Sequence, residues 1–202
     1  MPQLDSDSFT YSDGALATVS SGKWAADSNL GDLDVSSGAV RSFTTNRAAR
    51  IASWTGSTAD HYAQCTLVTP DTNYGAGPII RSDGAGTFYQ VGINAINGST
   101  SALYRWAAGT QIELQQFSMT VANGDTIYLE AQGTTLVVKQ NGTVRTTLAG
   151  EATIASGRPG LSGYTNWSLD NWAAGDFGGA AVLVVPIRFQ RRRRQKERTV
   201  RA

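Results

Sequence analysis

Residues 134–148 read Thr-Thr-Leu-Val-Val-Lys-Gln-Asn-Gly-Thr-Val-Arg-Thr-Thr-Leu, with Asn141-Gly142 between two short runs of alternating apolar and polar residues. Both central residues of a type I′ turn need positive φ, which Asn and Gly adopt most readily. The stretch therefore predicts a tight β-hairpin. The same pattern of short alternating runs and turn residues continues from Gly38 to Trp172.

Twelve strand-like runs are separated by clusters of Gly, Asn, Asp, Ser and Pro, which suit turns. They cover residues 39–43, 48–54, 61–69, 77–82, 87–95, 101–107, 111–118, 126–132, 134–140, 143–148, 158–164 and 167–173. Residues 1–35 are turn-rich, and no window sustains a 3.6-residue period, so helix is expected to be minor. About a dozen short strands predict an all-β fold of two packed antiparallel sheets.

Charge divides the chain into an acidic body and a basic end. From Arg188 onward there are eight Lys or Arg and one Glu, while the preceding residues carry a net charge of −6. We therefore expect a sandwich domain over 1–177, followed over 178–202 by a Gly/Ala joint, a short β-prone run and an Arg-rich arm.

The N-terminus lacks the pattern of a signal peptide, and the longest apolar stretch is too short to cross a bilayer. Synthesis in the cytoplasm and no membrane contact are expected. The single Cys65, on an alternating run, is predicted to be buried and inert.

The order of several motifs resembles the concanavalin A-like lectin/glucanase family, in particular its laminin G-like relatives. The motifs are Asp7-Ser8-Phe9 with Asp13-Gly14 and Trp24; 77–83 followed by 88–93; 136–142 ending in Asn-Gly; and 157–163 with 169–172. Together they span about residues 5–177. The resemblance implies a two-sheet antiparallel jelly-roll sandwich with a convex and a concave sheet, and Trp24 and Trp172 are predicted to lie in its core.

Catalytic members of that family are recognised by carboxylates alternating along one strand, roughly as Glu-x-Asp-x-Glu. The four glutamates here are Glu113, Glu130, Glu151 and Glu197, and none has an acidic residue two positions away. Glycoside hydrolysis needs a positioned pair of carboxylates. We therefore assign no catalytic residue and keep a degenerate glycoside hydrolase only as a second alternative.

Aromatic and arginine side chains are the candidates for carbohydrate binding, because rings stack on sugar faces and arginines can line a groove. The candidates are Trp54, Tyr104, Trp106, Arg81 and Arg105, and Tyr164 and Trp167 also lie at or beside strand ends. Core packing for the rings and cross-strand salt bridges for the arginines are the competing interpretations.

Metal and cofactor signals are weak. His61 is the only histidine and opens a strand, so a structural role is expected for it. Asp5 and Asp7 could meet Asp170 if the first and last strands pair, and such oxygen ligands suit Ca²⁺. Isolated Asx turns explain the same residues, so no cofactor is expected and calcium stays the alternative.

The C-terminal arm joins an apolar β-prone run to a block of arginines. These residues are Val182, Leu183, Val184, Val185, Arg191, Arg192, Arg193 and Arg194. We interpret them as a docking arm that adds a strand to another subunit and clamps an acidic surface; a solvated tail is the alternative. No aromatic residue interleaves the arginines, which argues against sequence-specific nucleic-acid binding.

An adhesive fold without an export signal, a disulfide or a catalytic pair favours a non-enzymatic interaction module. The resemblance extends to the non-catalytic kind of module found in bacteriophage virion proteins. The first expectation is thus a virion-surface protein, for capsid decoration or tail attachment, held to a capsid or tail subunit or to further copies of itself. The alternative is a carbohydrate-binding, lectin-like module with a glycan as its ligand.

Overall fold

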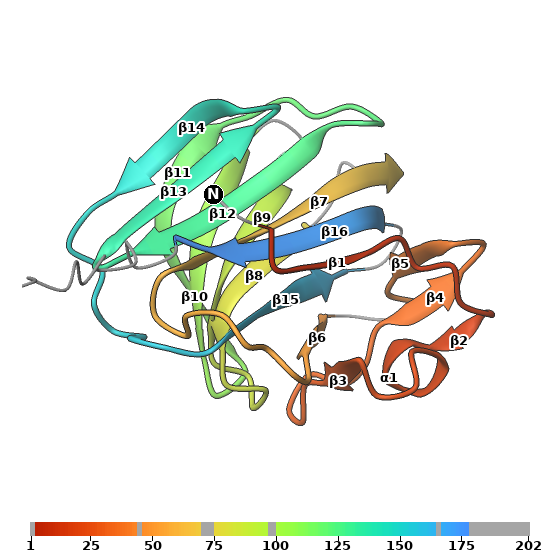
Figure 1. Ribbon diagram of the computed structural model, residues 1–202. Coiled ribbons are helices and arrows are strands. Elements are labelled where there is room, and N and C mark those ends of the chain that lie inside the picture. The colour runs from red at the N-terminus through yellow and green to blue at the C-terminus, as the bar shows by residue number, and fades with distance from the viewer. Residues whose placement is uncertain (1–2, 44–45, 70–74, 97–99, 165–166, 178–202) are drawn as a thin grey trace, which may run out of the picture.

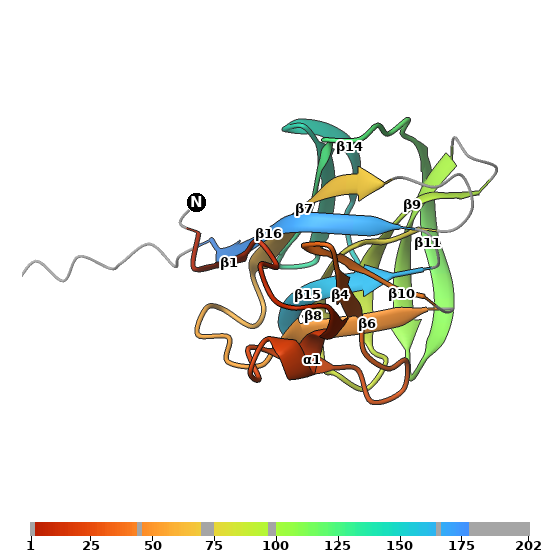
Figure 2. The same ribbon diagram turned by 90° about the vertical axis from the view of Figure 1, so that its right-hand side faces the viewer.

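The computed structural model describes residues 3–43, 46–69, 75–96, 100–164 and 167–177. It forms two antiparallel sheets that pack face to face as a jelly-roll sandwich, which confirms the predicted fold class. Figure 1 shows the nine-stranded sheet in front of the seven-stranded sheet, and Figure 2 shows the two as separate layers. Among the described residues, no helix has the length and apolar character needed to cross a membrane.

The nine-stranded sheet contains the hairpin predicted around Asn141-Gly142. Its order is β14 (Thr143–Leu148), β13 (Thr135–Gln140), β12 (Thr126–Gln132), β7 (His61–Thr69), β16 (Ser168–Asp176), β5 (Ala39–Arg41), β4 (Asp34–Ser36) and β2 (Gly14–Ala15), with β1 (Asp5–Asp7) also paired to β16. Between β13 and β14, Asn141 and Gly142 have φ of 51° and 79°. Both values are positive, as the predicted two-residue turn requires.

The seven-stranded sheet forms the other layer. Its order is β11 (Thr110–Ser118), β10 (Thr100–Ala107), β9 (Phe88–Ile96), β8 (Gly77–Ser82), β15 (Arg158–Gly163), β6 (Arg47–Ile51) and β3 (Trp24–Ala26). The helix α1 (Leu16–Val19) has four residues. All twelve predicted strands are present, and the turn-rich start holds four more, β1 to β4, of which only a first strand near Asp7 was anticipated. These strands have two or three residues each, too few for a periodic pattern.

The core between the sheets contains the two tryptophans predicted for it. Trp24 and Trp172 are buried, and their rings meet edge to face with centroids 4.8 Å apart. Their indole N–H groups donate to Asp7 Oδ2 at 2.8 Å and to the Gly160 carbonyl at 3.1 Å, so neither is buried unpaired. Cys65 is also buried, as predicted, and burial raises the pKa of its thiol.

Candidate functional site

The outer face of the seven-stranded sheet holds a second apolar cluster, separate from the core. Along β9, Tyr89, Val91 and Ile93 point into the core, so the alternating residues Phe88 and Gln90 point outward. The outward cluster consists of Ala48, Ile79, Phe88, Ala102, Tyr104 and Trp106, with Leu30 packed against it. The rings of Phe88 and Trp106 stack with centroids 5.6 Å apart. These apolar side chains form a packed layer on the outer face of the seven-stranded sheet.

A buried amide is fixed above this layer by three strands. Trp106 Nε1 on β10 donates to Gln90 Oε1 at 2.5 Å, and Gln90 Nε2 donates to Ser162 Oγ on β15 at 2.7 Å. Ser162 Oγ donates in turn to the carbonyl of Gly77 at 3.2 Å. An indole nitrogen can only donate, so it sets which end of the Gln90 amide is the carbonyl. The amide group is therefore held in one orientation.

Gln90 lines a cavity of about 190 Å³ on this outer face. The lining residues are Asn46, Gly75, Gln90, Gly92, Tyr104, Gln111 and Tyr164. They supply three amides and two phenols, all of which can both donate and accept hydrogen bonds while uncharged. Gly75 packs on the backbone of β9 so closely that a Cβ there would collide with Gly92 and Ile93. Because residue 75 is a glycine, no side chain fills this part of the cavity. The polar, uncharged lining suits a small, neutral ligand rich in hydroxyl groups.

Of the aromatic candidates, Tyr104 and Tyr164 line the cavity, and the others do not. Trp106 is 3% exposed and lies beneath it, where its ring is not available for stacking on a ligand. Trp54 is half-buried elsewhere, with its indole N–H donating to the Ser57 carbonyl at 2.9 Å. Trp167 is buried in the core. Two of the predicted aromatic residues, Tyr104 and Tyr164, thus line the cavity, whereas the buried ring of Trp106 does not.

The two arginine candidates also lie away from the cavity. Arg105 follows Tyr104 on β10 and so points to the opposite face, where its Nη1 lies 2.6 Å from Thr153 Oγ1 and 3.4 Å from Glu151 Oε1. Arg81 is 2% exposed and has a positive φ of 54°. Its guanidinium donates to the carbonyls of Ala59, Ile154 and Gly133 at 2.7–2.8 Å, so it joins three loops and has no free edge for a ligand.

The amides Asn46, Gln90 and Gln111 were missed by sequence analysis. Single amide residues on strands are common and carry no motif. The only available signal was alternation, which places Gln90 outward between the core residues Tyr89 and Val91. Which outward residues surround one cavity depends on the pairing of β9 with β10 and β10 with β11, and that pairing is not local information.

His61 is buried, as the structural interpretation requires, and its Nε2 accepts the backbone N–H of Arg81 at 3.1 Å. Burial, and then the positive charge of Arg81, lower the pKa of His61 from 6.5 to about 4. Between these two pH values the unfolded chain binds a proton that the folded chain does not, so the folded state loses stability as the pH falls.

We expect this effect to remove about 3 kcal/mol of unfolding free energy between pH 6.5 and pH 4, and none above pH 6.5. Urea unfolding of the wild type and of His61→Gln, measured across this range, checks it. The stability difference between the two proteins should shift against the wild type as the pH falls. A difference that stays constant from pH 7 to pH 4 would contradict the prediction.

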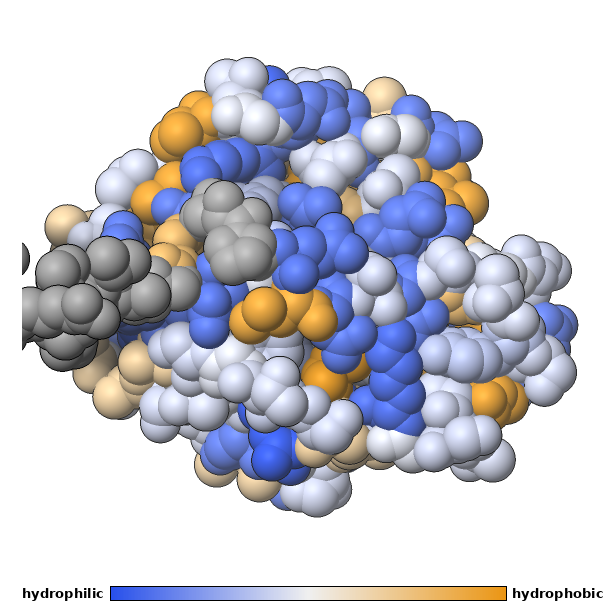
Figure 3. All heavy atoms as spheres, viewed as in Figure 1, coloured by the Kyte–Doolittle hydropathy of each residue, from blue (hydrophilic) through white to orange (hydrophobic). Residues whose placement is uncertain are grey.

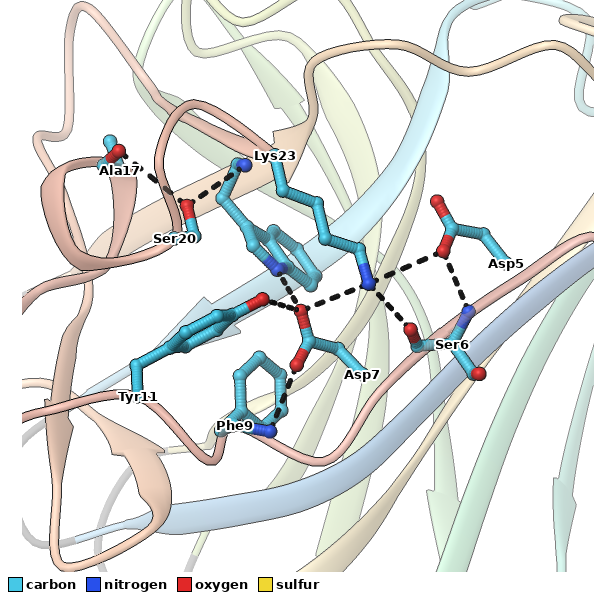
Figure 4. A network of polar contacts seen from close by, with 9 residues as sticks. Asp5, Ser6, Asp7, Phe9, Tyr11, Ala17, Ser20 and Lys23 are labelled. Atoms are coloured by element: carbon cyan, nitrogen blue, oxygen red, sulfur yellow. Dashed lines mark hydrogen bonds and ion pairs between the residues drawn. The ribbon is translucent and has the colours of Figure 1, made fainter.

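The predicted pairing of the first and last strands is present, and it places Asp7 opposite Trp172. Figure 4 shows how the Asp7 carboxylate is used. Its Oδ2 accepts from Tyr11 Oη at 2.6 Å and from Trp24 Nε1 at 2.8 Å, and it lies 3.2 Å from Lys23 Nζ. Burial alone would raise the pKa of Asp7, but these hydrogen bonds and the lysine lower it.

The other calcium candidates are also engaged in local contacts. Asp5 Oδ1 accepts the N–H of Ser6 at 2.8 Å, and Asp170 Oδ1 accepts the N–H of Asn171 at 2.6 Å. Within the part of the chain that the structure describes, no group of three His, Cys, Asp or Glu residues could hold a metal ion. A calcium site at Asp5, Asp7 and Asp170 stays an untested alternative.

The two carboxylates considered for hydrolysis lie on different sheets, Glu113 on β11 and Glu130 on β12. Glu130 Oε2 is bonded to Lys139 Nζ at 2.9 Å, and neither glutamate lines the cavity.

Figure 3 shows the outer face of the nine-stranded sheet as mainly hydrophilic, with apolar residues in small separate groups. The predicted docking arm, 182–185 with Arg191–Arg194, lies outside the described residues, and the domain boundary at 177 stays a prediction.

Comparisons with known proteins bear on the fold. No family model and no curated protein sequence matches the chain. Among solved structures, a Bacillus subtilis protein of unknown function with a galectin-like fold is similar with a TM-score of 0.61 and 6% identity over 87% of this chain and 96% of that one. The carbohydrate-binding module CBM66 from Bacillus subtilis has a TM-score of 0.56 and 13% identity over 74% and 91% of the two chains.

A β-1,3-1,4-glucanase (lichenase) from a mouse hindgut metagenome is similar to the same degree, with a TM-score of 0.56 and 10% identity over 85% of this chain and 98% of that one. Identities this low show a shared fold and nothing finer, and the neighbours include both binding modules and an enzyme. The chain therefore has the two-sheet, concanavalin A-like jelly-roll fold that it shares with these solved structures.

Proposed function

We propose that this protein is a non-catalytic carbohydrate-binding module that holds part of a glycan in the cavity over β9, β10 and β11. The observation that carries the proposal is the lining itself, in which three amides and two tyrosines converge and no described lining residue is charged. Sugar hydroxyls both donate and accept hydrogen bonds, and so do these groups. A volume of about 190 Å³ is below the roughly 300 Å³ at which pockets for drug-sized ligands begin, so the cavity suits one small ring.

Preorganisation supports the same conclusion. A buried polar side chain normally uses its hydrogen bonds within the protein, and Gln90 is held on both sides while it still faces the cavity. Fixing the amide before the ligand arrives lowers the entropy cost of binding. The neighbouring folds include a protein described as a carbohydrate-binding module, which fits this proposal.

The lining also favours binding over hydrolysis. Hydrolysis of a glycosidic bond needs two carboxyl groups on either side of the bond, and none of the described residues that line the cavity carries one. The expected role at a virion surface has no support from the solved structures named above, and the predicted docking arm lies outside the described residues. We therefore put glycan binding ahead of that role.

A glycan array tests the proposal. The unmutated protein should bind one or more glycans, and Gln111→Ala should weaken that binding about fivefold, because one neutral hydrogen bond contributes on the order of 1 kcal/mol. Tyr104→Phe should have a similar effect through loss of its hydroxyl. Gln132→Ala is the matched control, since Gln132 is an exposed strand glutamine on the other sheet. If no glycan is bound, or if both cavity variants bind like the control, the proposal is wrong.

A further inference from the structure

An irregularity in β11 determines which side chains flank the cavity. The register between β10 and β11 shifts between Leu103 and Tyr104, as a β-bulge does. In a regular strand, residues three apart point to opposite faces. Here Gln116 Nε2 donates to Glu113 Oε1 at 2.9 Å, so these two residues lie on the same side. The bulge thus brings Glu113 to the outer face with a bonded partner.

The register then places this carboxylate beside the cavity. Glu113 is paired directly with Tyr104, and Gln111 is paired with Trp106. Side chains of directly paired residues have Cβ atoms about 5 Å apart, and Tyr104 and Gln111 both line the cavity. Burial, and then the charge of Glu113, raise the pKa of Tyr104, which agrees with this closeness. Glu113 is exposed, so its charge faces the solvent from which a ligand arrives.

The cation next to Tyr104 points away from the cavity. Arg105 lies on the opposite face of β10 and is bonded to Thr153 and Glu151. None of the described residues that line the cavity is Lys, Arg or His. Glu113 is therefore the charged residue that strand pairing places directly opposite a described lining residue.

We infer that the site takes uncharged glycans and rejects acidic ones, with Glu113 as the residue that determines this specificity. The inference rests on the proposed function. A neutral sugar meets only amides and phenols, whereas a uronate, sialic acid or sulfated sugar brings a second negative charge close to the Glu113 carboxylate. Like charges repel, and no described cation lines the cavity to offset that repulsion.

The test compares pairs of glycans that share a core and differ by one carboxylate or sulfate group. A glycan array at low salt is probed with the wild type, Glu113→Gln and Glu130→Gln. The last variant removes the same charge from the other sheet, so it controls for net charge. We expect the wild type to bind each neutral member more tightly than its acidic counterpart. In Glu113→Gln the ratio of acidic to neutral binding should rise about fivefold, and in Glu130→Gln it should not change.

The outcomes separate this inference from the proposed function. If the wild type binds acidic glycans as well as their neutral counterparts, or if the ratio is the same in Glu113→Gln, the inference is wrong and glycan binding stands. If both charge variants raise the ratio equally, net charge explains the selectivity and the assignment to Glu113 is wrong. If no glycan is bound by any of the three proteins, the proposed function fails and the inference fails with it.

Discussion

Replacing Arg81 by methionine is expected to lower the free energy of unfolding by about 4 kcal/mol. The guanidinium donates to the carbonyls of Ala59, Gly133 and Ile154, and it is almost fully buried. Methionine fills similar space but donates no hydrogen bond, so three carbonyls lose their partner, each at a cost of roughly 1–3 kcal/mol when water cannot replace it. Urea unfolding monitored by tryptophan fluorescence gives the value.

Two further variants make the Arg81 result specific. Arg145→Met removes an arginine from an exposed position on β14 and should change stability by less than about 0.5 kcal/mol. Arg81→Lys keeps the charge but cannot reach three carbonyls with the planar fork of a guanidinium, so its loss should lie between the other two. A loss below 1 kcal/mol for Arg81→Met would show that these carbonyls find other partners.

Trp172→Ala is expected to cost a similar amount, about 4 kcal/mol, because removing a buried tryptophan leaves a cavity that the core cannot close. Trp172 is completely buried, its ring packs edge-on against Trp24, and its N–H reaches the Gly160 carbonyl. It therefore ties β16 in one sheet to β15 in the other. Thermal and urea unfolding should both show the loss.

The matched comparison is Trp54→Ala, which removes a tryptophan that is only half-buried. Its cost should be no more than about half that of Trp172→Ala, since less apolar area returns to water. Trp172→Phe should cost less than Trp172→Ala, because most of the ring remains and only part of the volume and the hydrogen bond are lost. If Trp172→Ala and Trp54→Ala lowered the free energy of unfolding equally, burial would not explain the contribution of these tryptophans to stability.

The strands with the clearest local signal were predicted to the residue. β7, β8, β12 and β14 have the bounds expected from alternation and from the turn residues on either side of them. The Asn141-Gly142 turn belongs to the same class, because positive φ at two adjacent positions is a requirement of the local backbone and is met by residue type. Burial of Trp24, Trp172 and Cys65 followed from residue type as well.

The short strands at the N-terminus show where this local information ends. β1 and β4 have three residues each and exist because β16 and β5 offer them a paired edge. Arg81 is a similar case. On a predicted strand its charge suggested a ligand groove, yet the loops at Ala59 and Ile154 enclose it. The residues next to β1, β4 and Arg81 in the sequence do not indicate which strands or loops will contact them.

The class of the fold, the hairpins and the absence of a carboxylate pair along one strand all follow from residues that are neighbours in the chain. The candidate site does not, because its residues come together only when distant strands pair. Trp106, Gln90 and Ser162 lie on β10, β9 and β15 and meet through strand pairing. A bulge in β11 places Glu113 and Gln116 on the same side of the strand, and Glu113 is paired with the lining residue Tyr104. A one-residue change in any of these registers would send the same side chains to the other face, because successive residues of a strand point in opposite directions.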